Sequence, residues 1–173
     1  MNVHDRFDPN TGLLTQSFLL TLLEHELARA KRHPAPIAIL RLRPLFDPAA
    51  GGEVEASAFS FVGQILSSGI RAADIAGHYE DDLLVILPVT DRQGGVIVAR
   101  RLLGQLCGVQ RTRRFDAYQL SACIGVVAHP SGFTVTPQRL IAQAAQALRA
   151  ALQKGPGTVI CYDEIQESEQ ESG

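Results

Sequence analysis

Arginine and aspartate three residues apart, at Arg71 and Asp74, could bind a ligand or each other. Arg71 and Asp74 form an R-x-x-D pattern, and Arg101 follows on a later expected helix with Arg100 beside it. An arginine fork can bind a phosphate or a carboxylate through two parallel hydrogen bonds, and a carboxylate can accept from N–H donors. The R-x-x-D pattern is weak by itself. Its plainer interpretation is a surface ion pair between Arg71 and Asp74, worth about 0–1 kcal/mol.

The remaining polar residues form no recognisable catalytic or metal-binding set. The five histidines do not have the spacing of a zinc site. Three cysteines, Cys107, Cys123 and Cys161, match neither a zinc motif nor a disulfide framework. We interpret them as buried thiols of a protein in a reducing cytoplasm. These residues therefore give no candidate for catalysis, for a metal ion or for a cofactor.

Hydrophobic periodicity and turn residues predict an alternation of helices and strands. The expected helices are 15–33, 54–70, 91–107 and 137–154, and the expected strands are 37–43, 72–78, 83–89, 118–128 and 158–163. The middle of this order is β-α-β-β-α-β. It predicts an α+β sandwich with a ferredoxin-like core, in which helices cover a mostly antiparallel sheet.

Length and composition favour one globular domain. The chain has 173 residues, of which 46% are hydrophobic and 20% charged. We expect an N-terminal lead at 1–14, the domain at 15–165 and a disordered acidic tail at 166–173. The net charge of -2 argues against nucleic-acid binding. No apolar run approaches the ~20 residues that span a bilayer, so we expect no membrane insertion.

Several segments, in the correct order, resemble the GGDEF family of diguanylate cyclases. DPNTGLLTQSF resembles the family's opening D-x-L-T-G-L-x-N-R, and HYEDDLLVILPVTD resembles R-Y-G-G-D-E-F-x-V-x-L-P-x-T-D. SACIGVVA resembles S-I-G-V-A, and the closing ALRAALQKGPGTVI resembles A-L-Y-x-A-K-x-x-G-R-N-x-V. The resemblance covers Asp8 to Asp163.

The resemblance also implies that catalysis has been lost. Active members join two GTP molecules with the help of two metal ions held by carboxylates. The first metal-binding Asp of the family falls on Arg41, and the second acidic position of that strand falls on Arg43. The signature turn becomes Glu80-Asp81-Asp82, whether it is aligned without a gap or with one deleted residue, and it has no glycine. We therefore expect no enzymatic activity.

Two interpretations of Arg41 remain open. It is either a solvated arginine near the end of its strand, or a replacement for the metal that pairs with Glu80, Asp81 or Asp82. A partly buried pair of this kind would be costly to break from one side only.

The R-x-x-D motif stands at the position where the family binds its product, cyclic di-GMP, as an inhibitor. The resemblance implies that Arg71, Asp74 and Arg101, with Arg100 adjacent, bind this ligand. We expect a cyclic di-GMP receptor that signals to an unidentified protein partner, and the ligand could link two copies into a homodimer. The alternative is an interaction scaffold that binds no nucleotide.

Overall fold

The computed structural model describes residues 6–46, 52–108, 120–131 and 134–171. The first five residues of the expected lead, residues 118–119 of an expected strand and residues 172–173 of the tail lie outside these ranges. The elements follow one another as α1 (Gln16–Arg32), β1 (Ile37–Leu45), α2 (Gly52–Gly69), β2 (Ile75–Tyr79), β3 (Asp82–Pro88), α3 (Arg92–Gly108), β4 (Ser121–His129), α4 (Pro137–Lys154), β5 (Thr158–Cys161) and α5 (Tyr162–Glu171).

The described strands form one sheet in the order β2-β3-β1-β4-β5. The β1–β3, β1–β4 and β2–β3 pairs are antiparallel, and only β4–β5 is parallel. The segment from β1 to β4 therefore has the β-α-β-β-α-β connectivity that the sequence predicted. The expected α+β fold with a mostly antiparallel sheet is confirmed.

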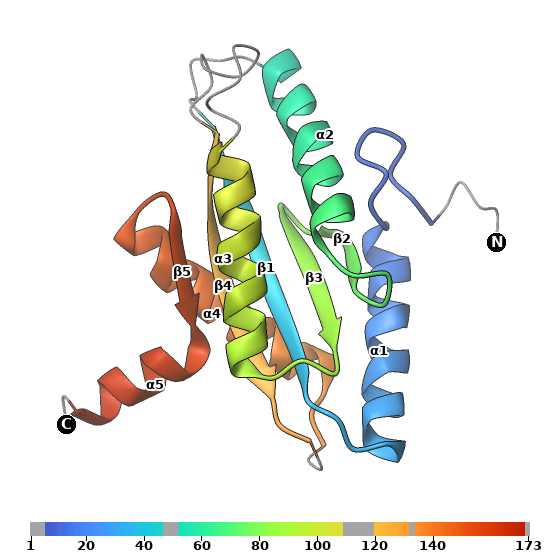
Figure 1. Cartoon of the computed structure of the whole chain (residues 1–173), viewed down its shortest axis with the longest axis vertical. Helices are drawn as coiled ribbons and strands as arrows, with labels where there is room; N and C mark the ends of the chain where they lie inside the picture. The colour runs from blue at the N-terminus through green and yellow to red at the C-terminus, as the bar shows by residue number, and fades with distance from the viewer. Residues whose placement is uncertain (1–5, 47–51, 109–119, 132–133, 172–173) are drawn as a thin grey trace.

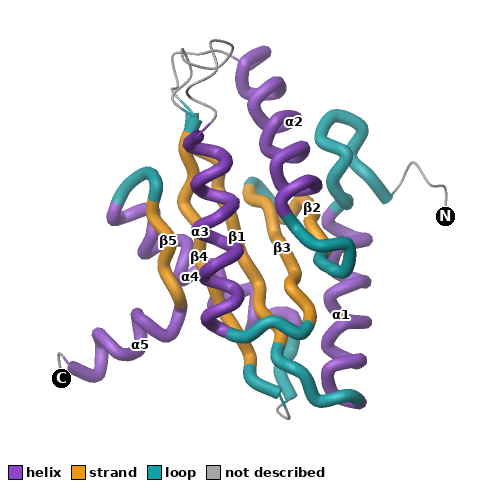
Figure 2. Tube along the Cα trace, viewed as in Figure 1, coloured by secondary structure: helices purple, strands orange, loops and turns teal. Residues whose placement is uncertain are grey.

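Helices cover both faces of the sheet, as Figures 1 and 2 show. Helices α2 and α3 pack on one face through a core that includes Leu40, Leu66 and Leu102. Helices α1 and α4 pack on the other face, where Leu19 and Leu140 enter the core. Side chains alternate along a strand, so the β1 residues adjacent to Leu40 face the α1 and α4 layer.

Helix α4 lies directly against the backbone of β4 at Gly125. A Cβ atom on Gly125 would overlap the α4 backbone at Ala144 and Leu148. By contrast, Gly104 on α3 has open space where a side chain would stand. The first glycine is thus required by a close approach between helix and strand.

The folded unit begins before residue 15, contrary to the boundary expected from the sequence. Leu13 and Leu14 are buried. The Leu14 N–H donates to the Ala76 carbonyl at 3.2 Å, and the His78 N–H donates to the Leu14 carbonyl at 2.8 Å. These bonds attach the lead to the outer edge of β2, where backbone groups would otherwise be unpaired.

The acidic tail is also ordered, since α5 continues to Glu171 where we expected disorder from residue 166. Ile165 packs on a core cluster at the end of α4. Arg92, the first residue of α3, forms ion pairs with Asp163 at 3.5 Å and with Glu167 at 3.1 Å. The acidic, polar composition of this segment does not reveal the packing of Ile165 or the ion pairs with Arg92, which hold α5 in place. None of the helices in the described ranges is long and apolar enough to cross a membrane.

Candidate functional site

Arg41 lies at the centre of a network of charged side chains on the α1 and α4 face of the sheet. Its Nε donates to Asp82 Oδ2 at 2.5 Å, and one of its terminal nitrogens donates to Glu80 Oε2 at 2.6 Å. Arg43 Nε donates to the second oxygen of Asp82 at 2.6 Å. The paired interpretation of Arg41 is therefore confirmed, with Glu80 and Asp82 as partners. Asp81 is exposed, and no ion pair joins it to Arg41 among the described residues.

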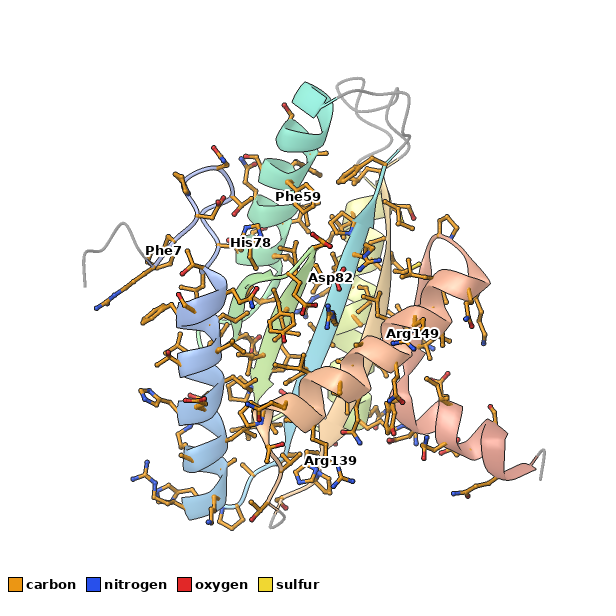
Figure 3. All side chains as sticks on the ribbon, turned by 180° about the vertical axis from the view of Figure 1, so that it is seen from behind. Phe7, Phe59, His78, Asp82, Arg139 and Arg149 are labelled. Atoms are coloured by element: carbon orange, nitrogen blue, oxygen red, sulfur yellow. The ribbon has the colours of Figure 1, made fainter. Side chains whose placement is uncertain are left out.

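Burial differs sharply within this network. The side chain of Asp82 is 1% exposed and that of Arg41 is 9% exposed, whereas Glu80 is 59% exposed. Figure 3 shows Asp82 on the sheet between α1 and α4. Burial lowers the pKa of Arg41, but the hydrogen bonds and charges of Asp82 and Glu80 outweigh this effect and raise its pKa. Arg41 is thus a permanent internal cation.

The hairpin turn brings the carboxylates to the arginines. Tyr79 pairs with Asp82, so Glu80 and Asp81 form the turn between β2 and β3. Glu80 adopts a φ of 52°, in the region that favours glycine, and its N–H donates to Gln16 at the start of α1 at 2.8 Å. The Tyr79 ring also lies 5.0 Å from the Arg41 guanidinium, as in a cation–π contact.

This donor set does not suit a divalent metal ion. Both Asp82 oxygens already accept from guanidinium groups, and two fixed positive charges stand where a cation would approach. Two arginines and two carboxylates also cancel in charge, so the Arg41 cluster (Arg41, Arg43, Glu80 and Asp82) is electrically balanced without an ion. The interactions in this cluster are ion pairs between the side chains of β1, β3 and the turn between β2 and β3.

The R-x-x-D segment forms a tight turn between α2 and β2. The Asp74 N–H donates to the Arg71 carbonyl at 3.0 Å, and Asp74 Oδ2 accepts from the Arg71 N–H at 2.8 Å. Within the described part of the chain, no ion pair joins the two side chains and Asp74 Oδ1 makes no hydrogen bond. Arg71 is exposed and Asp74 is half-buried. The carboxylate therefore shapes the turn, while the Arg71 side chain points to solvent.

The structure separates the two neighbouring arginines of α3. Arg101 donates to the Gly69 carbonyl at 2.7 Å, at the end of α2 and two residues before Arg71. Arg100 instead lines a cleft between α3 and α5, together with Glu164. Arg71, Asp74 and Arg101 thus belong to one region, whereas Arg100 lies on a different side of α3.

A second polar network joins the N-terminal segment to β2, and sequence reasoning did not find it. Asp8 Oδ1 accepts from the Thr11 hydroxyl at 2.9 Å, and the Thr11 hydroxyl oxygen also lies 2.8 Å from His78 Nε2. Burial raises the pKa of Asp8, but hydrogen bonds from Thr11 and the charge of His78 outweigh it and lower its pKa. Figure 3 places His78 beside the N-terminal loop. The sequence signal for this network is the polar segment that ends in Thr11 and Gly12, and that segment belongs to the expected lead outside the domain.

The chain belongs to the GGDEF family. It matches the family described as "Diguanylate cyclase, GGDEF domain" over residues 5–158. No curated protein sequence shows a significant match.

Solved GGDEF structures share the fold. The GGDEF domain of DgcB from Caulobacter crescentus, solved in complex with c-di-GMP, has a TM-score of 0.81 and 14% identity over 94% of this chain and 99% of that chain. The active GGEEF domain of a diguanylate cyclase from Vibrio cholerae has a TM-score of 0.77 and 17% identity over 87% of this chain and 97% of that one.

The diguanylate cyclase SiaD from Pseudomonas aeruginosa, solved in complex with its activator SiaC, has a TM-score of 0.80 and 23% identity. The match covers 92% of this chain but only 63% of the SiaD chain, so this chain spans less than two thirds of SiaD. At these identities the similarity establishes the fold alone.

Proposed function

We propose that this chain is a catalytically inactive GGDEF domain that binds cyclic di-GMP through Arg71, Asp74 and Arg101 and passes the bound state to a protein partner. The observation that carries the first half is the Arg41 cluster. Both oxygens of the buried Asp82 are engaged by arginines, one of which occupies the position of a metal-binding Asp in the family pattern. The buried carboxylate of Asp82 therefore has no oxygen left for the metal of a metal-bound triphosphate.

The region around Arg71 supports the second half. The turn after α2 supplies an exposed arginine and a half-buried carboxylate, and α3 supplies a second arginine that is anchored at Gly69. These groups can match the phosphates and the guanine edges of cyclic di-GMP. Arg100 is left out of this proposal because it lines another cleft. Fold relatives include a GGDEF domain solved with c-di-GMP.

Calorimetry with cyclic di-GMP, and separately with GTP and Mg²⁺, tests both halves. We expect heat with the first ligand only. Arg71→Ala should weaken binding by about 1–3 kcal/mol, the range for a lost charge-assisted contact. Arg149→Ala, which removes an exposed arginine from α4 on the opposite face of the sheet, is the matched control and should leave the affinity unchanged.

Asp74 needs its own pair of variants because it also holds the turn. Asp74→Asn keeps an acceptor for the Arg71 N–H, whereas Asp74→Ala removes it. If the carboxylate reads guanine N1 and N2, both variants weaken binding, and only the alanine variant loosens the turn. An unchanged affinity in Asp74→Asn would remove Asp74 from the ligand site.

The position of Arg101 bears on whether the ligand site is completed within one chain or shared by two copies. Its anchor beside Arg71 supports completion of the site within one chain, without the ligand-linked dimer that the symmetry of cyclic di-GMP allows. Light scattering at one protein concentration should then show the same mass with saturating ligand as without ligand. Absence of heat with every nucleotide would favour the scaffold alternative, and product formed from GTP above a no-enzyme control would overturn the loss of catalysis.

A further inference from the structure

Helix α3 presents an apolar side chain to solvent beside a cleft that the proposed function does not use. Ile97 is 56% exposed and is one of three large hydrophobic residues exposed in the described part of the chain. The cleft has a volume of about 530 Å³ and lies between the first turns of α3 and the helix α5. Val96 and Ile97 supply the apolar side chains of its lining, and Asp91, Arg92, Arg100 and Glu164 supply the charged ones.

The charges around Ile97 are arranged in a definite order. Arg92 at the start of α3 is paired with Asp163 and Glu167, so α5 lies beside the N-terminal end of α3, as Figure 1 also shows. Glu164 therefore stands on the N-terminal side of Ile97. Arg100 stands about one turn, or ~4.5 Å, on its C-terminal side. Among the described residues neither Arg100 nor Glu164 forms an ion pair, and both are exposed.

Such an order is complementary to itself. If a second copy is placed by a two-fold axis near Ile97, with the two α3 helices antiparallel, Ile97 packs on the apolar part of the opposite cleft. Arg100 of each copy then faces Glu164 of the other. An isologous interface needs this property, since each contact occurs twice.

We propose that this face of α3 and α5 is a homodimer interface, with Ile97 at its centre and reciprocal Arg100–Glu164 ion pairs at its border. The occupant of the cleft is a second copy of this chain. The interface needs no nucleotide and lies on a different side of α3 from the Arg101 anchor. The dimer interface is independent of the ligand-binding proposal, which calorimetry tests.

Sedimentation velocity without nucleotide, over protein concentrations from about 1 to 200 µM, tests this interface. We expect a concentration-dependent dimer. Ile97→Glu should weaken the dimer about tenfold or more, because it places a charge at the centre of the contact. The matched control is Val89→Glu, an apolar-to-acid change at a side chain that is 65% exposed and lines a different pocket, beside α1. That variant should keep the wild-type mass.

A charge exchange identifies the border contacts. Arg100→Glu and Glu164→Arg should each weaken the dimer, by about tenfold, through like-charge repulsion across the two-fold axis. The double variant restores both ion pairs with reversed sign and should recover dimerisation. Far-UV circular dichroism confirms that α5 stays folded in each variant.

Two results would overturn the proposal. One is a wild-type chain that stays monomeric over the whole concentration range. The other is a dimer that Ile97→Glu does not weaken. Failure of the double variant to recover the dimer would show that Arg100 and Glu164 do not face each other, which refutes the antiparallel arrangement.

Discussion

Removing the arginine of the Arg41 cluster is the sharpest test of how this domain is held together. Arg41→Met keeps much of the length of the side chain but removes its charge and its donors. Asp82 is 1% exposed and would lose one of its two arginine partners, while Glu80 would lose its ion pair with Arg41. Because a buried carboxylate cannot regain water at this position, the loss should appear as a lower free energy of unfolding.

The magnitude follows from burial. Breaking a buried ion pair from one side costs about 3–5 kcal/mol when the remaining charge has no other partner. Arg43 still donates to Asp82 at 2.6 Å, so the cost should be smaller. We expect about 2–4 kcal/mol for Arg41→Met. At ~2–4 °C per kcal/mol for a domain of this size, the melting temperature should fall by roughly 5–15 °C.

Urea unfolding followed by circular dichroism measures the effect, with two companion variants. Glu80→Gln changes a side chain that is 59% exposed and should cost only about 0–1 kcal/mol. The double variant Arg41→Met with Asp82→Leu replaces the buried pair by apolar side chains, and should recover most of the loss or exceed wild-type stability. That recovery separates an unpaired buried charge from a simple loss of packing.

The reasoning fails if Arg41→Met costs less than about 1 kcal/mol, since Asp82 would then have found water or another donor. It also fails if the double variant is no more stable than Arg41→Met alone. In that case the arginine contributes by packing, and the charge pairing has no special role.

Two further predictions concern packing and pH. Gly125→Ala should destabilise the domain by about 3 kcal/mol or more, because its Cβ meets the α4 backbone. Gly104→Ala, in open space on a helix, should stabilise it by about 0.5–1 kcal/mol in the same thermal melts. Asp8→Asn should cost about 1 kcal/mol at pH 7. The folded-state pKa of Asp8 lies below its ordinary value of 3.8. The stability difference between wild type and Asp8→Asn should therefore disappear in urea titrations as pH falls through the folded-state pKa. A difference that stays constant with pH would show that the Asp8 carboxylate does not stabilise the fold.

The sequence predicted the fold well because its periodic segments are long and their ends are marked. Thr136 accepts from the Arg139 N–H and Pro137 begins α4, as a helix start of this type requires. The two errors lie at the ends of the domain. There, order depends on single contacts, such as Arg92 with Glu167, that join segments far apart in the chain. Local composition carries no information about such contacts.

The sequence predicted only part of the candidate site, because the rest depends on which face of a strand or helix each residue occupies. The family pattern placed Arg41 at the position of a metal-binding Asp, and opposite charge made pairing with the acidic turn one of two interpretations. The pattern could not say that Asp82 is the buried partner, because that depends on which face each strand residue occupies. Nor could it separate Arg100 from Arg101, since adjacent helix residues point about 100° apart and the direction of the core must be known first.

The charge balance of the Arg41 cluster links stability to the proposed loss of catalysis. A carboxylate at position 41 would face the buried Asp82 and would need a cation to offset the repulsion between them. Arg41 supplies that positive charge as part of the chain, with one nitrogen on Asp82 and another on Glu80. An arginine fixed in this way cannot be exchanged or removed by a chelator, and its bonded donors are taken up by Asp82 and Glu80. The residue whose charge offsets that of Asp82 in place of a metal is therefore the same residue on which the proposed loss of catalysis rests.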